Sequence, residues 1–349
     1  MGFGSSVLSA PFSVSEAIMR RRTLLMSAGA AALGLANAAV PAAAQDVRTL
    51  RFGTALPADS PPGAGARVFE SEIRRRTGGR FRTEYFPDGM LGSESAMLKD
   101  LQQGRLDMAF ITGAVLPEVV VETGAFSLPF IFDGVAHARD MLDGPIGQGC
   151  LARFRDSNLV ALAWGENGLR HMTSATRPIR TPDDLKGVKF GVPQSVSAVI
   201  GFETLGANVS PVALPELYGA LESGRLDGQE SPIATIQATK IWRVQKYLTL
   251  SGHIYDPAVI LMSPKVFDAL SPEDQAAFAE VATLAALASR RHAAGSQTEG
   301  IELLSQAGME VVRTIDRARF IAALQPAQPR FEAMFGAGLV GWIRDQNIA

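Results

Sequence analysis

The side chains that could do chemistry in this chain are few and scattered. The four histidines show neither a His-Glu-x-x-His pattern nor the spacing with cysteine that holds zinc (His137, His171, His253 and His292). There is no Gly-x-Ser-x-Gly motif, no Walker phosphate loop and no Gly-x-Gly-x-x-Gly after a predicted strand. We therefore expect no metal site, no cofactor and no catalytic residues, and the sequence is more typical of a binding protein than of an enzyme.

Any binding site must be positioned by short apolar strands that alternate with longer helical patterns. The candidate strands are residues 50–54, 81–86, 108–112, 159–164, 188–192, 258–263 and 309–314. A first amphipathic helix is predicted over residues 65–76. This alternation is typical of an α/β protein.

Two further helices have clear start signals. Thr181 followed by Pro182 places a cap and a proline at a helix start, and Ser271 followed by Pro272 repeats the pattern. The second start opens a long Ala-rich helical stretch that runs towards Leu304, with a bend expected near Gly295.

One stretch of sequence occurs twice. Leu-x-x-Gly-Arg-Leu-Asp spans residues 101–107 and again 221–227, each time between a predicted helix and a predicted strand. Both glycines lie where a left-handed helix cap is expected. Coincidence between two ordinary helix ends is one explanation, and two related lobes with a ligand cleft between them is the one we prefer.

Length and charge limit the class of protein. A chain of 349 residues is expected to form two domains. Its net charge is −2, and residues 1–44 hold three arginines and one glutamate, so residues 45–349 have 33 − 3 = 30 basic and 35 − 1 = 34 acidic side chains. A net charge of −4 argues against a nucleic-acid partner. Cys150 is the only cysteine, so no internal disulfide can form.

The first 44 residues are predicted to be an N-terminal extension and export signal. Arg20, Arg21 and Arg22 precede an apolar run at 26–40, and small residues lead to a predicted cleavage after Ala44. A membrane anchor is the alternative, although the run is short and weakly hydrophobic for a span. The arginines fit a Sec signal or a twin-arginine signal, and Met19 is a candidate true start.

Several motifs occur in an order that resembles a known family, the DctP-type solute receptors of tripartite ATP-independent periplasmic (TRAP) transporters. The resemblance covers nearly all of residues 45–349. It is carried by GLRHMTS at 168–174, DDLKGVK at 183–189, ELYGAL at 216–221 and DGQESP at 227–232, with shorter matches at 86–92, 104–107 and 128–130.

The resemblance implies an α/β, two-lobed periplasmic binding protein fold with a hinge and a long helix crossing both lobes. It also implies a periplasmic monomer that binds a small solute and docks on membrane permease subunits. We expect lobe I to comprise residues 45–167 and 257–296, and lobe II residues 168–256 and 297–349.

The sequence departs from the family pattern at two expected ligand contacts. Family members usually carry an arginine in the strand after Asp-Leu-Lys-Gly, where its planar fork grips the solute carboxylate, and the residue here is Gly191. Family members usually carry an asparagine just before the final proline of the motif at 227–232, and the residue here is Ser231. Arg170 keeps the position of a second family arginine, so we expect it to bind the ligand, with an internal ion pair as the alternative.

Other ligand contacts are predicted by position. Glu94, Thr112 and Gln194 could offer hydrogen bonds. Each of the first two also has a plain structural explanation, as an acid at a helix start and as a strand end. The apolar candidates are Leu214, Phe190 and Trp164, and each of them could instead belong to the core. Lys189 is a second candidate cation.

Loss of the family arginine would open space and remove positive charge from the cleft. We therefore expect a bulkier or less acidic solute, such as a polyol, an aromatic acid or a substituted carboxylic acid, while an aliphatic carboxylate held by Arg170 or Lys189 stays open. The alternatives to a transport receptor are a ligand-sensing protein that feeds a signalling partner and, less favoured, an α/β enzyme.

Overall fold

The structure is a computed structural model that describes residues 47–345, which belong to one compact unit beginning at Gln45. The expected export signal, with Arg20, Arg21, Arg22 and the candidate start Met19, lies outside the described residues. Within residues 47–345, no helix has the length and apolar character that crossing a membrane requires.

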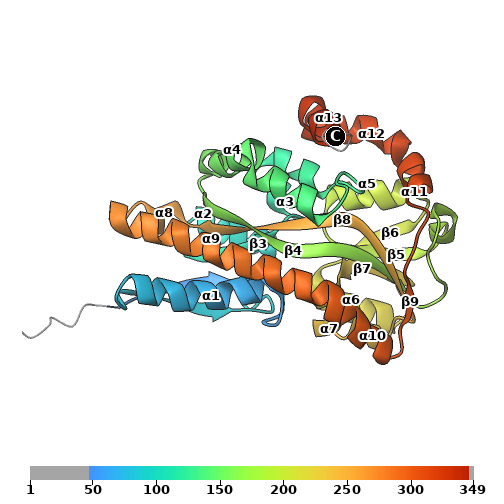
Figure 1. Cartoon of the computed structure of the whole chain (residues 1–349), viewed down its shortest axis with the longest axis horizontal. Coiled ribbons are helices and arrows are strands. Elements are labelled where there is room, and N and C mark those ends of the chain that lie inside the picture. Colours follow the sequence, from blue (N-terminus) through green and yellow to red (C-terminus); the bar gives the residue numbers. More distant parts are fainter. Residues whose placement is uncertain (1–46, 346–349) are drawn as a thin grey trace, which may run out of the picture. The chain divides into compact units, whose positions relative to one another are not determined.

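The strands form one mixed sheet in the order β2-β1-β3-β8-β4-β7-β5-β6, with β9 added beside β8 (Figure 1). The strands are β1 (Arg48–Gly53), β2 (Phe81–Phe86), β3 (Met108–Thr112), β4 (Val160–Ser174), β5 (Lys189–Val192), β6 (Asn208–Pro211), β7 (Gly228–Pro232), β8 (Tyr247–Met262) and β9 (Glu310–Val312).

The sheet consists of two similar halves joined by two long strands. Strands β2-β1-β3 pair in parallel in the first lobe, and β6-β5-β7 pair in parallel in the second. Between them β4 and β8 run antiparallel to each other and extend into both lobes. Their register shifts between Glu166 and Gly168. The predicted lobe boundaries at 167/168 and 256/257 fall at this irregular point and stay a prediction.

Helices cover both faces of this sheet. They are α1 (Pro61–Arg76), α2 (Glu94–Gln102), α3 (Val135–Asp143), α4 (Pro145–Arg153), α5 (Val196–Thr204), α6 (Leu214–Glu222), α7 (Ile233–Ala238), α8 (Pro264–Phe267), α9 (Pro272–Gly295), α10 (Ile301–Gln306), α11 (Arg317–Leu324), α12 (Gln328–Phe335) and α13 (Ala337–Asp345).

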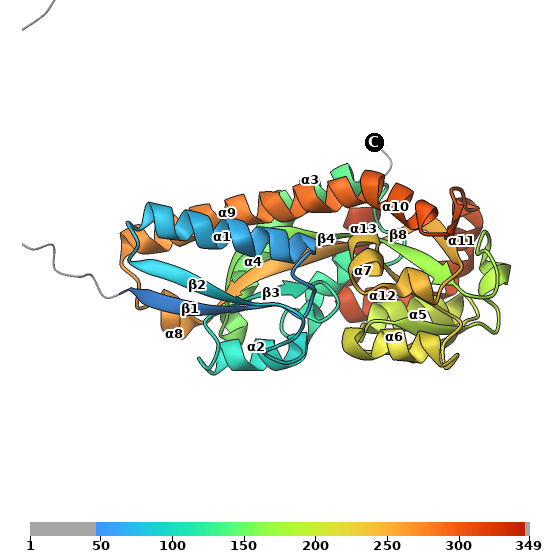
Figure 2. The same ribbon diagram turned by 90° about the horizontal axis from the view of Figure 1, so that it is seen from below.

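One long helical path crosses from the first lobe to the second. It starts at the predicted cap, where the Ser271 hydroxyl accepts the backbone N–H of Asp274, and it continues from α9 through a π-helical turn at Ser296–Gly300 into α10. Helix α9 packs against α1 and β4, and the later part packs against α7 and β9 (Figure 2). The irregular turn lies where the bend was expected.

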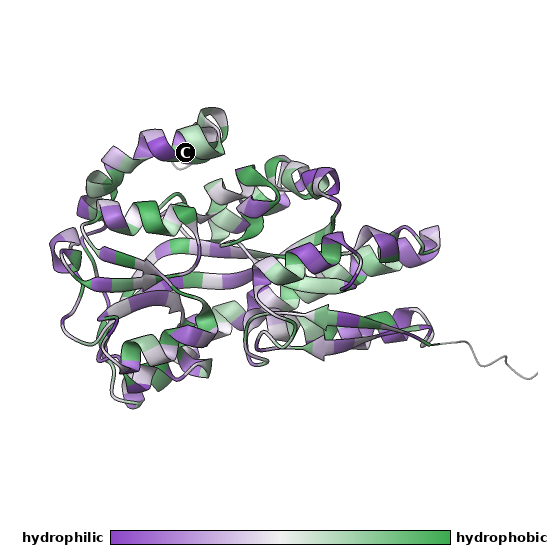
Figure 3. Cartoon of the chain, turned by 180° about the vertical axis from the view of Figure 1, so that it is seen from behind, coloured by the Kyte–Doolittle hydropathy of each residue, from purple (hydrophilic) through white to green (hydrophobic). Residues whose placement is uncertain are grey.

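Each lobe has a hydrophobic core on each face of the sheet. In β3, Met108 and Phe110 face α1 and α9, whereas Ala109 and Ile111 face the opposite core. This period of two, with both faces covered, explains why the strand reads as a continuous apolar run. Hydrophobic and hydrophilic residues vary around the covering helices, as expected for helices with one buried face (Figure 3).

The repeated sequence has the same structure in both lobes. Gly104 and Gly224 both have φ of +69°, the left-handed conformation that glycine adopts without strain. The carboxylate of Asp107 then accepts a backbone N–H from β1, and that of Asp227 accepts one from β5. The two copies therefore close equivalent βαβαβ units.

The last two helices pack differently from the expected partition. Residues 297–349 were assigned to the second lobe, but Phe331 in α12 and Val340 in α13 belong to the same core as Phe126 and Phe154 of the first lobe. Because a helix is held by the core that its apolar face covers, α12 and α13 stabilise the first lobe.

Candidate ligand-binding cleft

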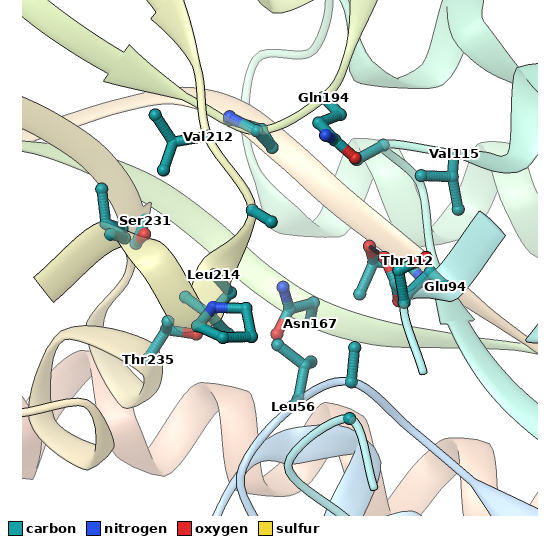
Figure 4. A pocket seen from close by; sticks show the side chains of 18 of the residues that line it. Leu56, Glu94, Thr112, Val115, Asn167, Gln194, Val212, Leu214, Ser231 and Thr235 are labelled. Atoms are coloured by element: carbon teal, nitrogen blue, oxygen red, sulfur yellow. Dashed lines mark hydrogen bonds between the residues drawn. The ribbon is translucent and has the colours of Figure 1, made fainter. Parts of the chain in front are cut away.

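A cavity of about 290 Å³ lies between the two lobes. The first lobe contributes Leu56, Ser93, Glu94, Ser95, Thr112 and Val115; the second contributes Gly191, Gln194, Val212, Leu214, Ser231 and Thr235; and Asn167, Arg170 and Glu230 come from β4 and β7. Figure 4 shows Glu94 and Thr112 on one side of the cavity, with Leu214, Ser231 and Thr235 on the other.

Two helices of nine residues each begin at this cavity. Ser93 caps α2 by accepting the backbone N–H of Ala96, and Leu214 and Pro215 open α6. The N-terminal ends of helices carry partial positive charge, so both contribute a potential that favours an anionic or electron-rich ligand.

Arg170 lies at the base of the cavity in a buried ionic network. Its Nε donates to Glu230 Oε2 at 2.5 Å, its Nη1 donates to Asp256 Oδ2 at 2.6 Å, and its Nη2 donates to the Glu230 carbonyl oxygen at 2.9 Å. Burial disfavours its charge, but the carboxylates of Glu230 and Asp256 outweigh burial and raise the pKa of Arg170. The ion pair that the sequence left as an alternative is therefore present, and Arg170 also lines the cavity.

The pKa values of the two carboxyl groups of this network shift in opposite directions. Burial opposes the ionised form of both, yet Arg170 lowers the pKa of Glu230, while for Asp256 burial prevails and raises the pKa. Glu230 also lies 3.3 Å from His253 through its Oε2. The base of the cavity thus contains one guanidinium and two carboxyl groups.

Three buried polar atoms around the cavity have no hydrogen-bond partner among the described residues. They are Asn167 Oδ1, Glu230 Oε1 and Thr235 Oγ1. Asn167 is held in place because its Nδ2 donates to Asp256. A buried polar atom without a partner is costly, so these atoms are candidates to bind ligand hydroxyls or water.

Glu94 and Thr112 form a pair on the first-lobe wall. The Glu94 carboxylate accepts the backbone N–H of Thr112 at 2.8 Å and its hydroxyl at 2.7 Å. Burial raises the pKa of Glu94 to about 7, against the lowering effect of these bonds. No salt bridge in the described residues involves Glu94, so its carboxyl group can take up a proton near neutral pH.

The cleft between two α/β lobes agrees with the sequence comparison. A family model described as "Bacterial extracellular solute-binding protein, family 7" (DctP) matches residues 52–333. The chain belongs to this family.

Relatives within the family include a "Solute-binding protein" of Verminephrobacter eiseniae, 39% identical over 303 residues, which cover 87% of this chain and 90% of the relative. A solved TRAP periplasmic solute-binding protein from a Bordetella species, with density interpreted as pantoate, is 39% identical with a TM-score of 0.82. One from Polaromonas sp. JS666, bound to D-erythronate, is 38% identical with a TM-score of 0.83. Each alignment with a structure covers 85% of this chain and 98% of the other.

These family members are two-lobed receptors, which confirms the predicted fold class and the predicted TRAP-type solute-binding function. The comparisons extend over both lobes of this chain. Members of the family are solute receptors rather than enzymes, and those named above are periplasmic or solute-binding proteins by description.

Gly191 corrects the expectation that the missing family arginine opens space. A Cβ on Gly191 would lie 2.7 Å from Leu226 Cδ1 and 3.3 Å from Leu217 Cδ1, so leucine side chains already fill that direction. The equivalent residue of the first lobe is Gly53, whose Cβ would lie 2.8 Å from Met97 Sδ. In both lobes the glycine lets a helix pack closely on a strand.

Gly191 itself lines the cavity, but three expected contacts do not. Trp164 is buried against Phe126, and its indole N–H donates to the Gly147 carbonyl oxygen, so it belongs to the core of the first lobe. Phe190 is core of the second lobe, as its alternative interpretation held. The Lys189 ammonium is exposed, donates to the Gly224 carbonyl oxygen and lies 3.5 Å from the Asp227 carboxylate, so it is held away from the cavity.

The remaining expected residues do line the cavity. Gln194 is exposed at its edge, Leu214 gives apolar surface, and the Ser231 hydroxyl donates to Gln229 Oε1. Since its proton is used in this bond, the Ser231 oxygen is left as a hydrogen-bond acceptor.

The sequence analysis did not predict three residues that line the cavity, Asn167, Thr235 and Glu230. The sequence analysis did not single out Glu230, although its place two residues before Pro232 on a strand that ends at the cleft could have indicated a contact. Asn167 and Thr235 are marked by no local motif.

Proposed function

We propose that this chain is an exported receptor for a small hydroxylated carboxylic acid, which it binds between its lobes and delivers unchanged to a TRAP permease. The observation that carries the proposal is the polar part of the cavity lining, which includes Asn167, Glu230 and Thr235, each with a buried oxygen that has no partner among the described residues. Ligand hydroxyls are donors that would satisfy them.

The carboxylate end of such a ligand has donors of its own. The Arg170 guanidinium has five N–H groups, of which its bonds to Glu230 and Asp256 use three. One N–H on each Nη is left for a ligand oxygen. The N-terminal ends of α2 and α6 add a favourable potential at the same cavity.

The relatives support the same class of solute. Pantoate and D-erythronate, named for the two similar structures, are both small carboxylic acids with hydroxyl groups. A cavity of about 290 Å³ suits a ligand of that size. The aromatic acids considered from the sequence have less support, because no aromatic side chain lines this cavity among the described residues.

Delivery follows from lobe closure and from export. A solute that contacts both walls binds the closed form better than the open form and shifts the population towards it. We propose that the closed monomer docks on the membrane permease subunits outside the cytoplasmic membrane, after the basic and apolar segment before Gln45 has directed export.

A thermal-shift screen of residues 45–349 tests the proposal. The panel should contain aldonic acids, pantoate, uronic acids, dicarboxylic acids, aromatic acids and neutral polyols. A ligand that binds only the native protein raises its melting temperature. We expect shifts with hydroxylated monocarboxylates; shifts confined to aromatic acids or neutral polyols would contradict the proposal.

A further inference from the structure

The cavity carries more negative than positive groups. Its charged lining residues are Glu94, Arg170 and Glu230, and Asp256 contacts Arg170 from behind. The guanidinium is bound to Glu230 and Asp256 within 2.6 Å, so its charge is already offset. A carboxylate that enters this cavity therefore needs a further group that offsets its negative charge.

Glu94 is the group that can do this. Its hydrogen-bond donors are neutral, the N–H and hydroxyl of Thr112, and it forms no salt bridge with a described residue, so the charge of its ionised carboxylate is only weakly compensated. The carboxyl group lines the same cavity as the ligand, and a second negative charge close by favours the protonated form.

Given the proposed function, we propose that Glu94 takes up a proton when the anionic solute binds, so that binding of the carboxylate is coupled to protonation of this wall of the cleft. One oxygen of the protonated group keeps the Thr112 N–H, and the other becomes an O–H donor that can reach a ligand oxygen. The pKa of about 7 in the unliganded protein means that this proton is available near neutral pH.

The other titratable groups around Glu94 have different partners. Arg170 and Asp256 act on it electrostatically. Beyond them, Glu230 is paired with Arg170 and lies near His253, while burial lowers the pKa of His171 to about 4. On the side of α2, Glu118 is exposed and accepts the hydroxyl of Ser95.

Calorimetry with D-erythronate on residues 45–349 tests the coupling. Titrations from about pH 6 to about pH 9, each in two buffers of different ionisation enthalpy, give the dissociation constant and the number of protons taken up. An aldonic acid is ionised throughout this range, so the ligand's own titration does not interfere. We expect the dissociation constant to rise by up to about tenfold per pH unit above neutrality, with net proton uptake in that range.

Two variants locate the proton. Glu94→Gln keeps a neutral hydrogen-bonding group, so we expect its dissociation constant to be flat with pH and its proton uptake to vanish. Glu118→Gln, a matched change at a nearby acid outside the cavity, should keep the wild-type slope.

The outcomes separate this proposal from the proposed function. A pH-independent dissociation constant with no proton uptake in the wild type, or a wild-type slope in Glu94→Gln, overturns the coupling while receptor function stands. If Glu94→Gln does not bind, the proton count in the wild type decides alone. Failure of D-erythronate and every other hydroxylated acid to bind at about pH 6 overturns the proposed function, and the coupling with it.

Discussion

The two lobes share one construction plan but present different walls to the cleft. Each has a parallel βαβαβ unit closed by the same Gly-Arg-Leu-Asp turn, and each uses a glycine, Gly53 or Gly191, to bring a helix onto a strand. The first-lobe wall contains the half-buried acid Glu94 and the hydroxyl of Thr112. The second-lobe wall is mainly apolar, with Val212 and other small hydrophobic residues.

This difference separates scaffold from specificity. Positions that hold the lobes together are equivalent in the two halves, whereas the residues at the strand ends and helix starts are free to differ. Glu94 is the first residue of α2, and the corresponding acid near the start of α6, Glu216, is exposed and outside the cavity. Similar sequence signals therefore produce a cavity-lining group in one lobe and a surface group in the other.

The largest effect is expected at the strand that both lobes share. Arg170→Ala leaves the carboxyl groups of Glu230 and Asp256 without their cation, and we expect a loss of about 3–5 kcal/mol in the free energy of unfolding as well as of ligand binding. Urea denaturation measures it, with Arg74→Ala on the exposed side of α1 as control. A change below about 1 kcal/mol would show that the network does not hold the lobes' common base together.

The second effect contrasts the two acids. The folded-state pKa of Glu94 is raised from 4.5 to about 7, so the folded protein holds more protons than the unfolded chain between these values, and stability falls as pH rises through this window. We expect the free energy of unfolding of the wild type to fall by about 1–3 kcal/mol between pH 4.5 and about pH 8. Glu94→Gln should not show this fall, and urea denaturation at a series of pH values measures it. The free energy of unfolding of Glu216→Gln should depend on pH as that of the wild type does. The same pH dependence in all three proteins would show that Glu94 and Glu216 do not differ in this respect.

The third effect tests the equivalence of the glycines. Gly191→Ala and Gly53→Ala each place a methyl group within 3 Å of a flexible side-chain end, so each should destabilise by about 1 kcal/mol as that side chain shifts. Gly191→Arg should cost more, about 1–3 kcal/mol, because Leu217 and Leu226 must both move. Tighter ligand binding by Gly191→Arg with unchanged stability would show that position 191 opens onto free space after all.

How far the sequence predicts this structure depends on whether the determining contacts are local. The limits of β2 and β3 and the cap at Ser271 were predicted correctly, since apolar runs and capping residues act within a few positions. The full lengths of β4 and β8 were missed because buried polar residues, such as Glu166 and Asp256, interrupt the apolar pattern at the centre of each strand.

The site follows the same rule. Glu94 and Thr112 could be placed by their positions at a helix start and a strand end. Gly191 was misinterpreted because the direction of its absent side chain depends on leucines 26 and 35 positions further along, at Leu217 and Leu226. Asn167 faces the cavity through a strand irregularity that no local motif announces.

The smallest effect is expected at Lys189. Its ammonium is exposed on the outer side of the second lobe, bound to the Gly224 carbonyl oxygen, so Lys189→Ala should change stability by less than about 0.5 kcal/mol and leave the dissociation constant unchanged. Calorimetry of the variant checks this. A clear loss of affinity would return Lys189 to the list of ligand contacts and give the second lobe a cation of its own.

The central claim is that the cleft recognises a hydroxylated carboxylate and releases it unaltered. Calorimetry of residues 45–349 with D-erythronate and with butyrate, which has the same chain length and carboxylate but no hydroxyls, tests it directly. The account predicts that D-erythronate binds one-to-one and is recovered unchanged. Butyrate should bind more weakly by roughly tenfold or more, because it has no hydroxyls to offer the polar groups of Asn167, Glu230 and Thr235. Equal affinity for the two acids, or recovery of a converted product, would contradict the account.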